Sequence, residues 1–108
     1  MKRRSKDQLQ EAIRRAKNNR ARAIAHYNLA LFHDNNARET EAIPHYLTAL
    51  HLGLTKEMKS HALAWLASSL YKIGKPQEAL QKARQAGRIA NQSLQKFLLG
   101  LERRIQTK

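Results

Sequence analysis

Five histidines have the widest chemical range in this chain, because imidazole can bind a metal or transfer a proton near neutral pH. They are His26, His33, His45, His51 and His61. His26 and His33 lie seven residues apart and would share one face of a helix, but neither has the histidine or acid four positions away that a helical zinc pair requires. The other three follow no common spacing. This pattern predicts packing or surface histidines and no metal site.

Nucleophilic and cofactor-binding motifs are absent from the sequence. Without cysteine there is no thiolate nucleophile, disulfide or Cys-based zinc site. There is no nucleophile elbow, phosphate-binding glycine loop or dinucleotide fingerprint, and no two carboxylates have a spacing specific for acid–base catalysis. The adjacent His33 and Asp34 are predicted to hydrogen-bond at a helix end, and Trp65, Tyr71 and Phe97 to pack in the core. We therefore expect a protein that is not an enzyme and uses no cofactor.

Positive charge is concentrated at the two ends of the chain. Lys and Arg number 21 against 8 Asp and Glu, a formal net charge of +13 on 108 residues. Residues 1–22 carry a net charge of +7 and residues 75–108 a net charge of +6, whereas residues 23–74 are neutral. A basic steering surface is expected from Arg3, Arg4, Arg14, Arg15, Arg20, Arg22, Arg103 and Arg104.

Three interpretations of this charge stay open. The first is a hydrated surface with no further role, and the second is an acidic protein partner that the electrostatic field would attract. The third is nucleic acid, since the nine basic side chains in residues 1–22 could neutralise several phosphates, although no aromatic residues are interleaved with them for base stacking. A membrane-surface helix is disfavoured, because Leu9 and Ile13 are the only bulky apolar residues of this segment.

Length and composition limit the architecture. A chain of 108 residues has room for one domain, and no apolar run approaches the roughly 20 residues that cross a membrane. The basic start leads into Ser5-Lys6-Asp7 and not into an apolar stretch, so no secretory signal is expected and a cytoplasmic location follows by default. Gly and Pro are scarce and no segment alternates with a period of two, which predicts an all-α fold.

Apolar residues recur at helical spacing in successive segments. The polar residues 17–20 either break the first helix or lie on its outer face. The expected helical segments cover about residues 6–17 and 23–34, either as two helices or as one continuous helix, and then residues 41–54, 56–73, 76–90 and 93–106. The capping signals are Ser5 with Gln8, Gly53 followed by Thr55, Gly74 followed by Pro76, and Asn91 at the end of the fifth segment.

The sequence also repeats at an offset of 37 residues. Leu29-Ala30 aligns with Leu66-Ala67, Glu41-Ala42-Ile43 with Glu78-Ala79-Leu80, and Ala37 with Gly74. In both copies a small residue falls where two antiparallel helices would cross closely. A single helix pair cannot bury its apolar face alone, so stacking on neighbours is expected.

This spacing resembles the tetratricopeptide repeat, a helix–turn–helix unit of 34 residues with small residues at fixed crossings. The likeness covers about residues 21–106 and is closest over residues 62–80. It is similar to small bacterial members that carry a His-Asp pair at the end of the first helix. The departures from the family pattern are His26 and Leu63 for its Trp, His33 and Leu70 for its Tyr, and Leu54 and Asn91 for its closing Pro.

The resemblance implies an antiparallel helix-pair superhelix, an α-solenoid of about five helices. A basic capping helix would occupy residues 1–20 and a repeat domain residues 21–108. Within that domain, two repeats would cover about residues 22–55 and 56–91, followed by a capping helix over residues 92–106. Two repeats are fewer than the usual minimum of about three, so the terminal helices, or a second subunit in a homo-oligomer, would have to cap the stack.

The resemblance further implies a concave groove, lined by the first helix of each pair, that holds a protein or peptide. Its expected residues are Tyr27, Leu31, Asp34 and Asn35 from the first copy and His61, Ala64, Ser68 and Lys72 from the second, with Arg103 or Arg104 from the last helix. The predicted function is a protein–protein interaction module for an acidic protein or peptide. The alternative is a basic helical protein associated with nucleic acid or the ribosome.

Overall fold

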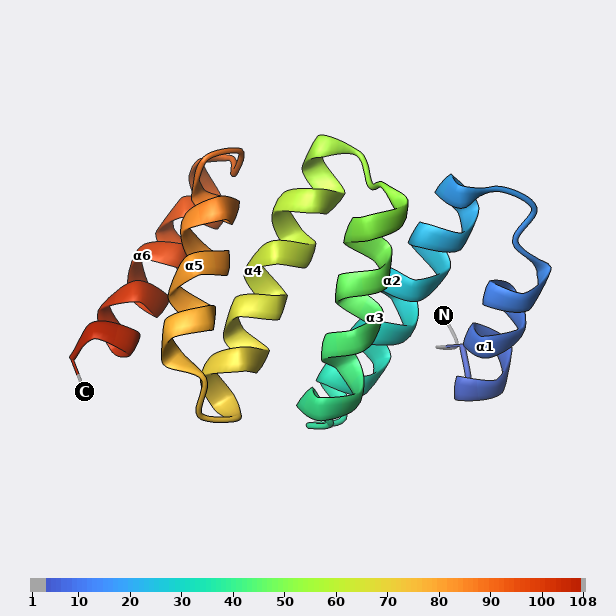
Figure 1. Ribbon diagram of the computed structural model, residues 1–108, viewed down its shortest axis with the longest axis horizontal. Coiled ribbons are helices and arrows are strands. Elements are labelled where there is room, and N and C mark those ends of the chain that lie inside the picture. The colour runs from blue at the N-terminus through green and yellow to red at the C-terminus, as the bar shows by residue number, and fades with distance from the viewer. Residues whose placement is uncertain (1–3, 108) are drawn as a thin grey trace. The chain divides into compact units, whose positions relative to one another are not determined.

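Six α-helices make up residues 4–107, the part of the chain that the computed structural model describes, and no strand occurs among those residues (Figure 1). The helices are α1 (Lys6–Arg15), α2 (Asn19–Asn35), α3 (Glu39–Leu52), α4 (Lys56–Lys72), α5 (Pro76–Gly87) and α6 (Gln92–Gln106). The all-α prediction is confirmed, whereas the expected count of about five helices is one short. None of these helices is long and apolar enough to span a bilayer.

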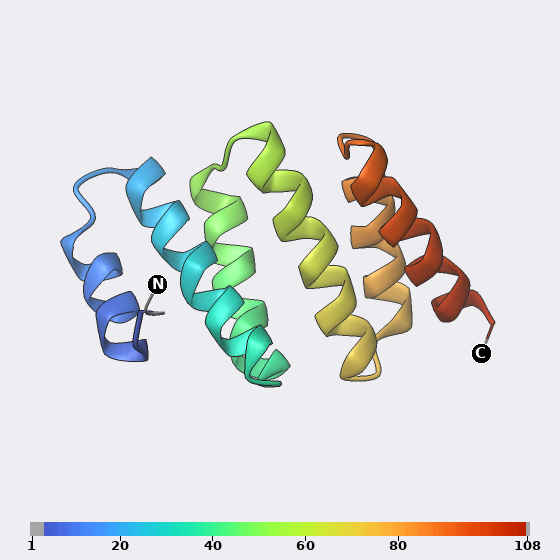
Figure 2. The same ribbon diagram turned by 180° about the vertical axis from the view of Figure 1, so that it is seen from behind.

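The helices fall into two compact units. The first ends at Leu54 and contains α1, α2 and α3, and the second begins at Thr55 and contains α4, α5 and α6. In the first unit α2 and α3 form an antiparallel pair, and α1 packs on α2. In the second unit α4 and α5 form the pair, and α6 packs mainly on α5. Figure 2 shows both pairs from behind.

A polar linker separates α1 from α2, so residues 17–20 break the helix and do not lie on its outer face. Asn18 caps α2, since its Oδ1 accepts a hydrogen bond from the Ala21 amide at 2.8 Å. Arg22 reaches back and donates from Nη2 to the Ala16 carbonyl, just beyond the last residue of α1, at 3.0 Å. Both bonds satisfy backbone groups that helix ends leave unpaired. The polar residues therefore end one helix and start the next, which accounts for the sixth helix.

Most other helix ends have the expected caps. Ser5 and Gln8 form a reciprocal capping box, with the Ser5 amide donating to Gln8 Oε1 at 2.8 Å and the Gln8 amide donating to Ser5 Oγ at 3.2 Å. Thr55 Oγ1 accepts from the Met58 amide at 3.3 Å, and Pro76 occupies the first turn of α5. Local side-chain chemistry is sufficient to place these ends.

Besides α1 and α2, whose ends at the linker differ from the prediction, α3 and α5 depart from their predicted bounds by two residues or more. α3 begins two residues earlier than expected, at Glu39, where the acidic side chains of Glu39 and Glu41 suit the positive end of the helix dipole. Pro44 consequently lies in the second turn of α3. α5 ends at Gly87, a residue of low helix propensity, and Asn91 caps α6 instead of closing α5.

The repeat predicted from the sequence is visible in the backbone. α2 and α4 both contain 17 residues, and both their first and last residues lie 37 positions apart. The turn after each helix has the same backbone bond across five residues, from the Arg38 amide to the His33 carbonyl at 2.8 Å and from the Lys75 amide to the Leu70 carbonyl at 2.9 Å. This bond defines a Schellman turn. Both hairpins therefore turn in the same way.

Alanine occupies the positions where the paired helices were expected to cross. Ala30 and Ala42 in the first pair, and Ala67 and Ala79 in the second, have no exposed surface. Small side chains at such positions allow helix axes to approach closely. The larger fully buried side chains fill the space around them; they include Leu29, Tyr46 and Leu66.

The two turns differ at one residue in the left-handed conformation. Gly74 has a φ of 83°, and its counterpart Ala37 has a φ of 58°. A Cβ disfavours this conformation by about 1–2 kcal/mol. The first turn therefore carries backbone strain that the second does not.

Replacing Ala37 by Gly is expected to raise the free energy of unfolding by up to about 1 kcal/mol, because the relieved strain exceeds the extra entropy of glycine in the unfolded chain. The reverse change, Gly74→Ala, should lower it by about 1 kcal/mol, since no atom lies within 4 Å of the added Cβ and only the backbone is affected. Urea denaturation followed by circular dichroism measures both. A destabilised Ala37→Gly variant would contradict the prediction.

Candidate functional site

A groove runs between α1 and α2 in the first unit. It consists of two adjoining hollows of about 470 and 540 Å³, and Arg4 and Asn28 line both of them. The remaining residues of the first hollow are Leu9, Leu31, Phe32, Asn35 and Asn36, and those of the second include Ala12, Arg15, Lys17 and Ile24. We call this feature the α1–α2 groove.

The α1–α2 groove combines apolar surface with hydrogen-bond donors. Leu9 is buried, and Leu31 and Phe32 are half-buried, so they form an apolar floor. The amides of Asn28 and Asn35 and the guanidinium of Arg4 add N–H donors along it. The Asn36 amide is already used, because its Nδ2 donates to the Phe32 carbonyl at 2.7 Å. Such a surface suits a peptide that offers both apolar side chains and acceptor oxygens.

Two of the four groove residues predicted in the first copy line this groove, and the other two contact α3. Leu31 and Asn35 line the first hollow. Asp34 Oδ2 instead accepts a hydrogen bond from the Tyr46 hydroxyl at 2.9 Å, and the Tyr27 ring lies 6.2 Å from the Tyr46 ring, measured between centroids. Tyr46 is fully buried, and burial is the main cause that raises the pKa of its hydroxyl, followed by the nearby Asp34 carboxylate. The phenol therefore stays protonated and continues to donate.

The residues predicted from the second copy all lie on α4 in the second unit. Ser68 is half-buried and Lys72 is exposed at the end of the helix. His61 Nδ1 lies 2.9 Å from the Glu57 carbonyl one turn earlier, and its ring lies 5.9 Å from that of Trp65. Ala64, in contrast, is fully buried and belongs to the core and not to a binding surface.

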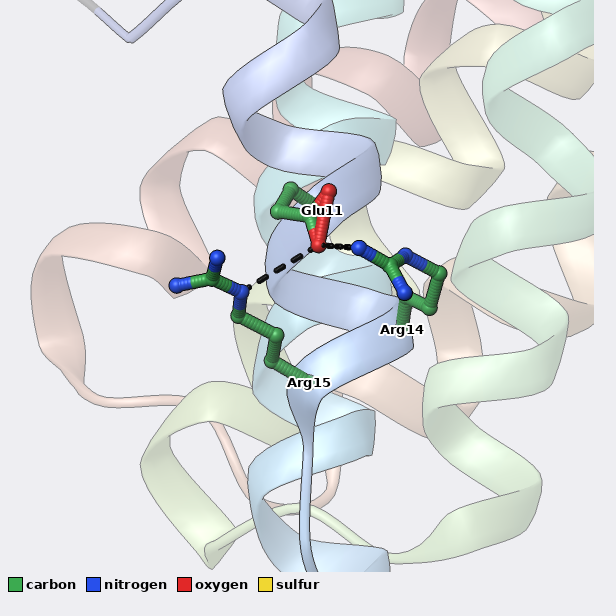
Figure 3. A network of polar contacts seen from close by, with 3 residues as sticks. All are labelled: Glu11, Arg14 and Arg15. Atoms are coloured by element: carbon green, nitrogen blue, oxygen red, sulfur yellow. Dashed lines mark hydrogen bonds and ion pairs between the residues drawn. The ribbon is translucent and has the colours of Figure 1, made fainter.

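Several of the predicted basic residues have partners inside the first unit. Glu11 contacts both Arg14 and Arg15, and its distance to Arg15 Nε is 3.2 Å (Figure 3). Arg22 is bound to the end of α1, as described above. These interactions reduce the charge that α1 presents to a partner.

The other basic residues of the predicted steering surface are exposed. Arg4 lines the α1–α2 groove, and Arg20 lies in the first turn of α2. Arg103 and Arg104 are exposed in the last turn of α6. Arg3 lies outside the described residues.

A cluster of three histidines lies inside the α2–α3 pair. His26 Nδ1 and His45 Nδ1 are 2.9 Å apart, within hydrogen-bond distance, and the rings of His33 and His45 are nearly parallel, with centroids 5.8 Å apart. His33 Nδ1 lies 3.2 Å from Glu41 Oε2, but this contact lacks hydrogen-bond alignment. We call His26, His33 and His45 the histidine cluster.

Burial lowers the pKa of every histidine in the cluster below the ordinary value of 6.5. The positive charge of Arg22 lowers the pKa of His26 further. At His33 the Glu41 carboxylate opposes burial without outweighing it, because Lys6 and Arg38 act in the same direction as burial. The cluster is therefore neutral at pH 7.

Sequence spacing failed to identify this cluster because His45 joins it from a different helix. In an antiparallel pair, residues about equally far from the connecting turn meet, and residues 26 and 45 lie on either side of the turn at residues 36–38 at similar distances. Once the α2–α3 hairpin is assigned, its pairing therefore indicates that His26 and His45 lie close together. Among residues 4–107, no three or more His, Cys, Asp or Glu side chains gather in a way that could hold a metal ion.

Comparison with protein-family models identifies a repeat family. The sequence model of a family described as a tetratrico peptide repeat matches residues 23–102. The curated proteins include no match to the chain.

Replacing Tyr46 by Phe is expected to lower the free energy of unfolding by about 1.5–3 kcal/mol, because a buried hydroxyl that donates to a carboxylate contributes about that much. Tyr71→Phe is the matched control, since its hydroxyl donates to the Arg104 carbonyl at a longer 3.4 Å, and it should cost less than about 1 kcal/mol. Urea denaturation of both variants at neutral pH tests this. An equal decrease in the free energy of unfolding for the two variants would show that the Tyr46–Asp34 hydrogen bond stabilises the fold no more than the Tyr71 bond does.

Proposed function

The chain belongs to the tetratricopeptide repeat family, a class of protein–protein interaction modules, and we propose that it binds an acidic peptide segment of a protein partner in the α1–α2 groove. The observation that carries this proposal is the composition of that groove, in which apolar side chains and N–H donors line the same two hollows. Peptide grooves in general gain affinity from apolar pockets and orientation from a few placed donors.

The acidic character of the partner follows from the charge around the groove. Arg4 and Lys17 line it beside Arg15, which is paired with Glu11, and none of the described residues that line its two hollows is acidic. The formal net charge of +13 would attract an acidic partner from a distance, and the attraction would weaken as salt is added. A carboxylate beside Arg4 would form a charge-assisted hydrogen bond.

The exposed face of α4 is proposed as a further contact surface, contributed by the second unit. The residues proposed for it are the partly exposed His61 and Ser68 and the exposed Lys72. Lys72 adds a positive charge suited to the same acidic partner, and the exposed Arg103 and Arg104 on α6 add to the attraction.

Nucleic acid is the competing partner, and the contacts of α1 weigh against it. Two of the exposed arginines of α1 share Glu11, which lowers the charge that this helix could offer to a phosphate backbone. Affinity for DNA or RNA of any sequence that falls steeply with salt would support nucleic acid instead.

A photo-crosslinking residue placed at position 35 is expected to capture partner proteins from nuclease-treated native lysate, whereas the same residue at position 81 is not. Asn35 lines the α1–α2 groove, and Gln81 is an exposed polar residue of α5 in the other unit, so the two positions are matched in chemistry. Equal capture at the two positions, or capture that nuclease abolishes, would contradict the proposal.

Once a captured segment is identified, Arg4→Ala should weaken its binding by about 10- to 100-fold and Asn35→Ala by about 2- to 10-fold, as expected for charged and neutral hydrogen bonds. Isothermal titration calorimetry measures both, and Gln81→Ala is the control with unchanged affinity. An Arg4→Ala variant that binds as tightly as the wild type would exclude the groove.

His61→Ala and Lys72→Ala are expected to weaken binding of the whole captured partner protein by up to about fivefold each, the range of exposed polar contacts, without changing helicity. Lys59→Ala is the control for Lys72→Ala. It removes the same charge from α4, and it lies two residues before His61, about 200° away around the helix. A larger effect for Lys59→Ala would place the contact surface on the opposite side of α4.

A further inference from the structure

The histidine cluster is held together by contacts that need neutral imidazole. The Nδ1 atoms of His26 and His45 lie 2.9 Å apart, and their ring centroids lie 5.1 Å apart. In a hydrogen bond between two imidazoles one Nδ1 donates and the other accepts, so the accepting nitrogen carries no proton. A proton on the accepting Nδ1 would break this bond, because two N–H groups would then face each other, and full protonation of both rings would place two positive charges in contact.

His33 extends the cluster and adds a buried polar atom. Its side chain is almost entirely buried, with 3% of the residue exposed, and its ring lies next to that of His45. Its Nδ1 has no hydrogen-bond partner among residues 4–107, although Glu41 Oε2 is 3.2 Å away. A proton on this ring would therefore enter a site with little water and with a single misaligned acceptor.

The charges that face the cluster come from every element packed around it. Lys6 in α1, Arg22 in α2 and Arg38 in the connecting turn disfavour protonation, and Glu41 in α3 favours it. His26 and His33 also disfavour protonation of His45. Three cations against one carboxylate make the surroundings unfavourable for additional positive charge.

We propose that His26, His33 and His45 form a proton-operated switch that opens the α2–α3 hairpin when its surroundings become mildly acidic. The switch acts on the hairpin itself and does not depend on the peptide-binding function proposed above.

The direction of the effect follows from proton counting. Once the hairpin opens, the three rings enter water and bind protons with the ordinary pKa of about 6.5. In the closed hairpin their pKa is lower, so the open form binds more protons at any pH between the two values. The closed form therefore has its full stability above about pH 6.5 and loses stability as the pH falls through the window below it.

Amide hydrogen exchange of the full chain between pH 7.5 and 5 tests the switch. After correction for intrinsic exchange rates, the opening equilibrium constant of α2 and α3 should rise about tenfold per pH unit for each net proton taken up below pH 6.5. Amides of α4 and α5, in the other unit, serve as the internal reference and should change less. Equal pH dependence in the two helix pairs would overturn the proposal.

Two variants assign the effect to the cluster. His45→Gln keeps a polar side chain beside His26 but cannot take up a proton. The change in the α2–α3 opening constant per pH unit should therefore be about tenfold smaller than in the wild type, which is the contribution of one proton. His51→Gln, which changes an exposed histidine of the same helix, should leave that dependence unaltered. An equal reduction in both variants would contradict the assignment.

A side-chain NMR titration of the wild-type chain tests the switch without any variant, and so does not depend on whether His45→Gln folds. The rings of His26, His33 and His45 should remain mostly neutral at the pH where a histidine in a short peptide is half protonated. Half-protonation of all three at or above pH 6.5 would exclude the switch.

Discussion

Two helices can pack closely at a crossing only where their side chains leave room, and this chain meets that constraint with alanine. Ala30 and Ala42 in one pair and Ala67 and Ala79 in the other have no exposed surface. Alanine contributes little apolar area, so each pair needs a third helix to complete its core. α1 supplies Leu9 to the first unit, and α6 supplies Leu94, Leu98, Leu101 and Ile105 to the second.

The two repeats satisfy this shared backbone with different side-chain chemistry. His26 and His33 in α2 correspond, at the offset of 37, to the buried Leu63 and Leu70 in α4. Tyr46, which donates to Asp34, corresponds to the fully buried Ala83. The first pair therefore contains titratable polar groups, and the second is mainly apolar at the matching positions.

Features that depend on nearby residues could be predicted from the sequence, and features that depend on contacts between helices could not. The capping box of Ser5, the cap at Thr55 and the repeat offset involve residues a few positions apart or a periodic pattern. The break before α2 has a local signal in the Asn18 cap, but the bond from Arg22 to the Ala16 carbonyl that closes the end of α1 follows from no local rule. In the candidate site, Leu31 and Asn35 were predicted as groove residues and Arg4 as part of a basic surface, but only the position of α1 beside α2 shows that the three line one hollow. His45 was overlooked because its partners are on α2.

Trp65 in α4 packs edge-on against Phe97 in α6, with ring centroids 5.1 Å apart and planes at 71°. It is the sole tryptophan of the chain and it lies in the second unit. Intrinsic tryptophan emission consequently reports the environment of the α4–α6 contact and is silent about α1, α2 and α3. A denaturation midpoint obtained from emission alone would characterise half of the molecule, and only a spectroscopic probe introduced into the first half would reveal whether both halves unfold in one step.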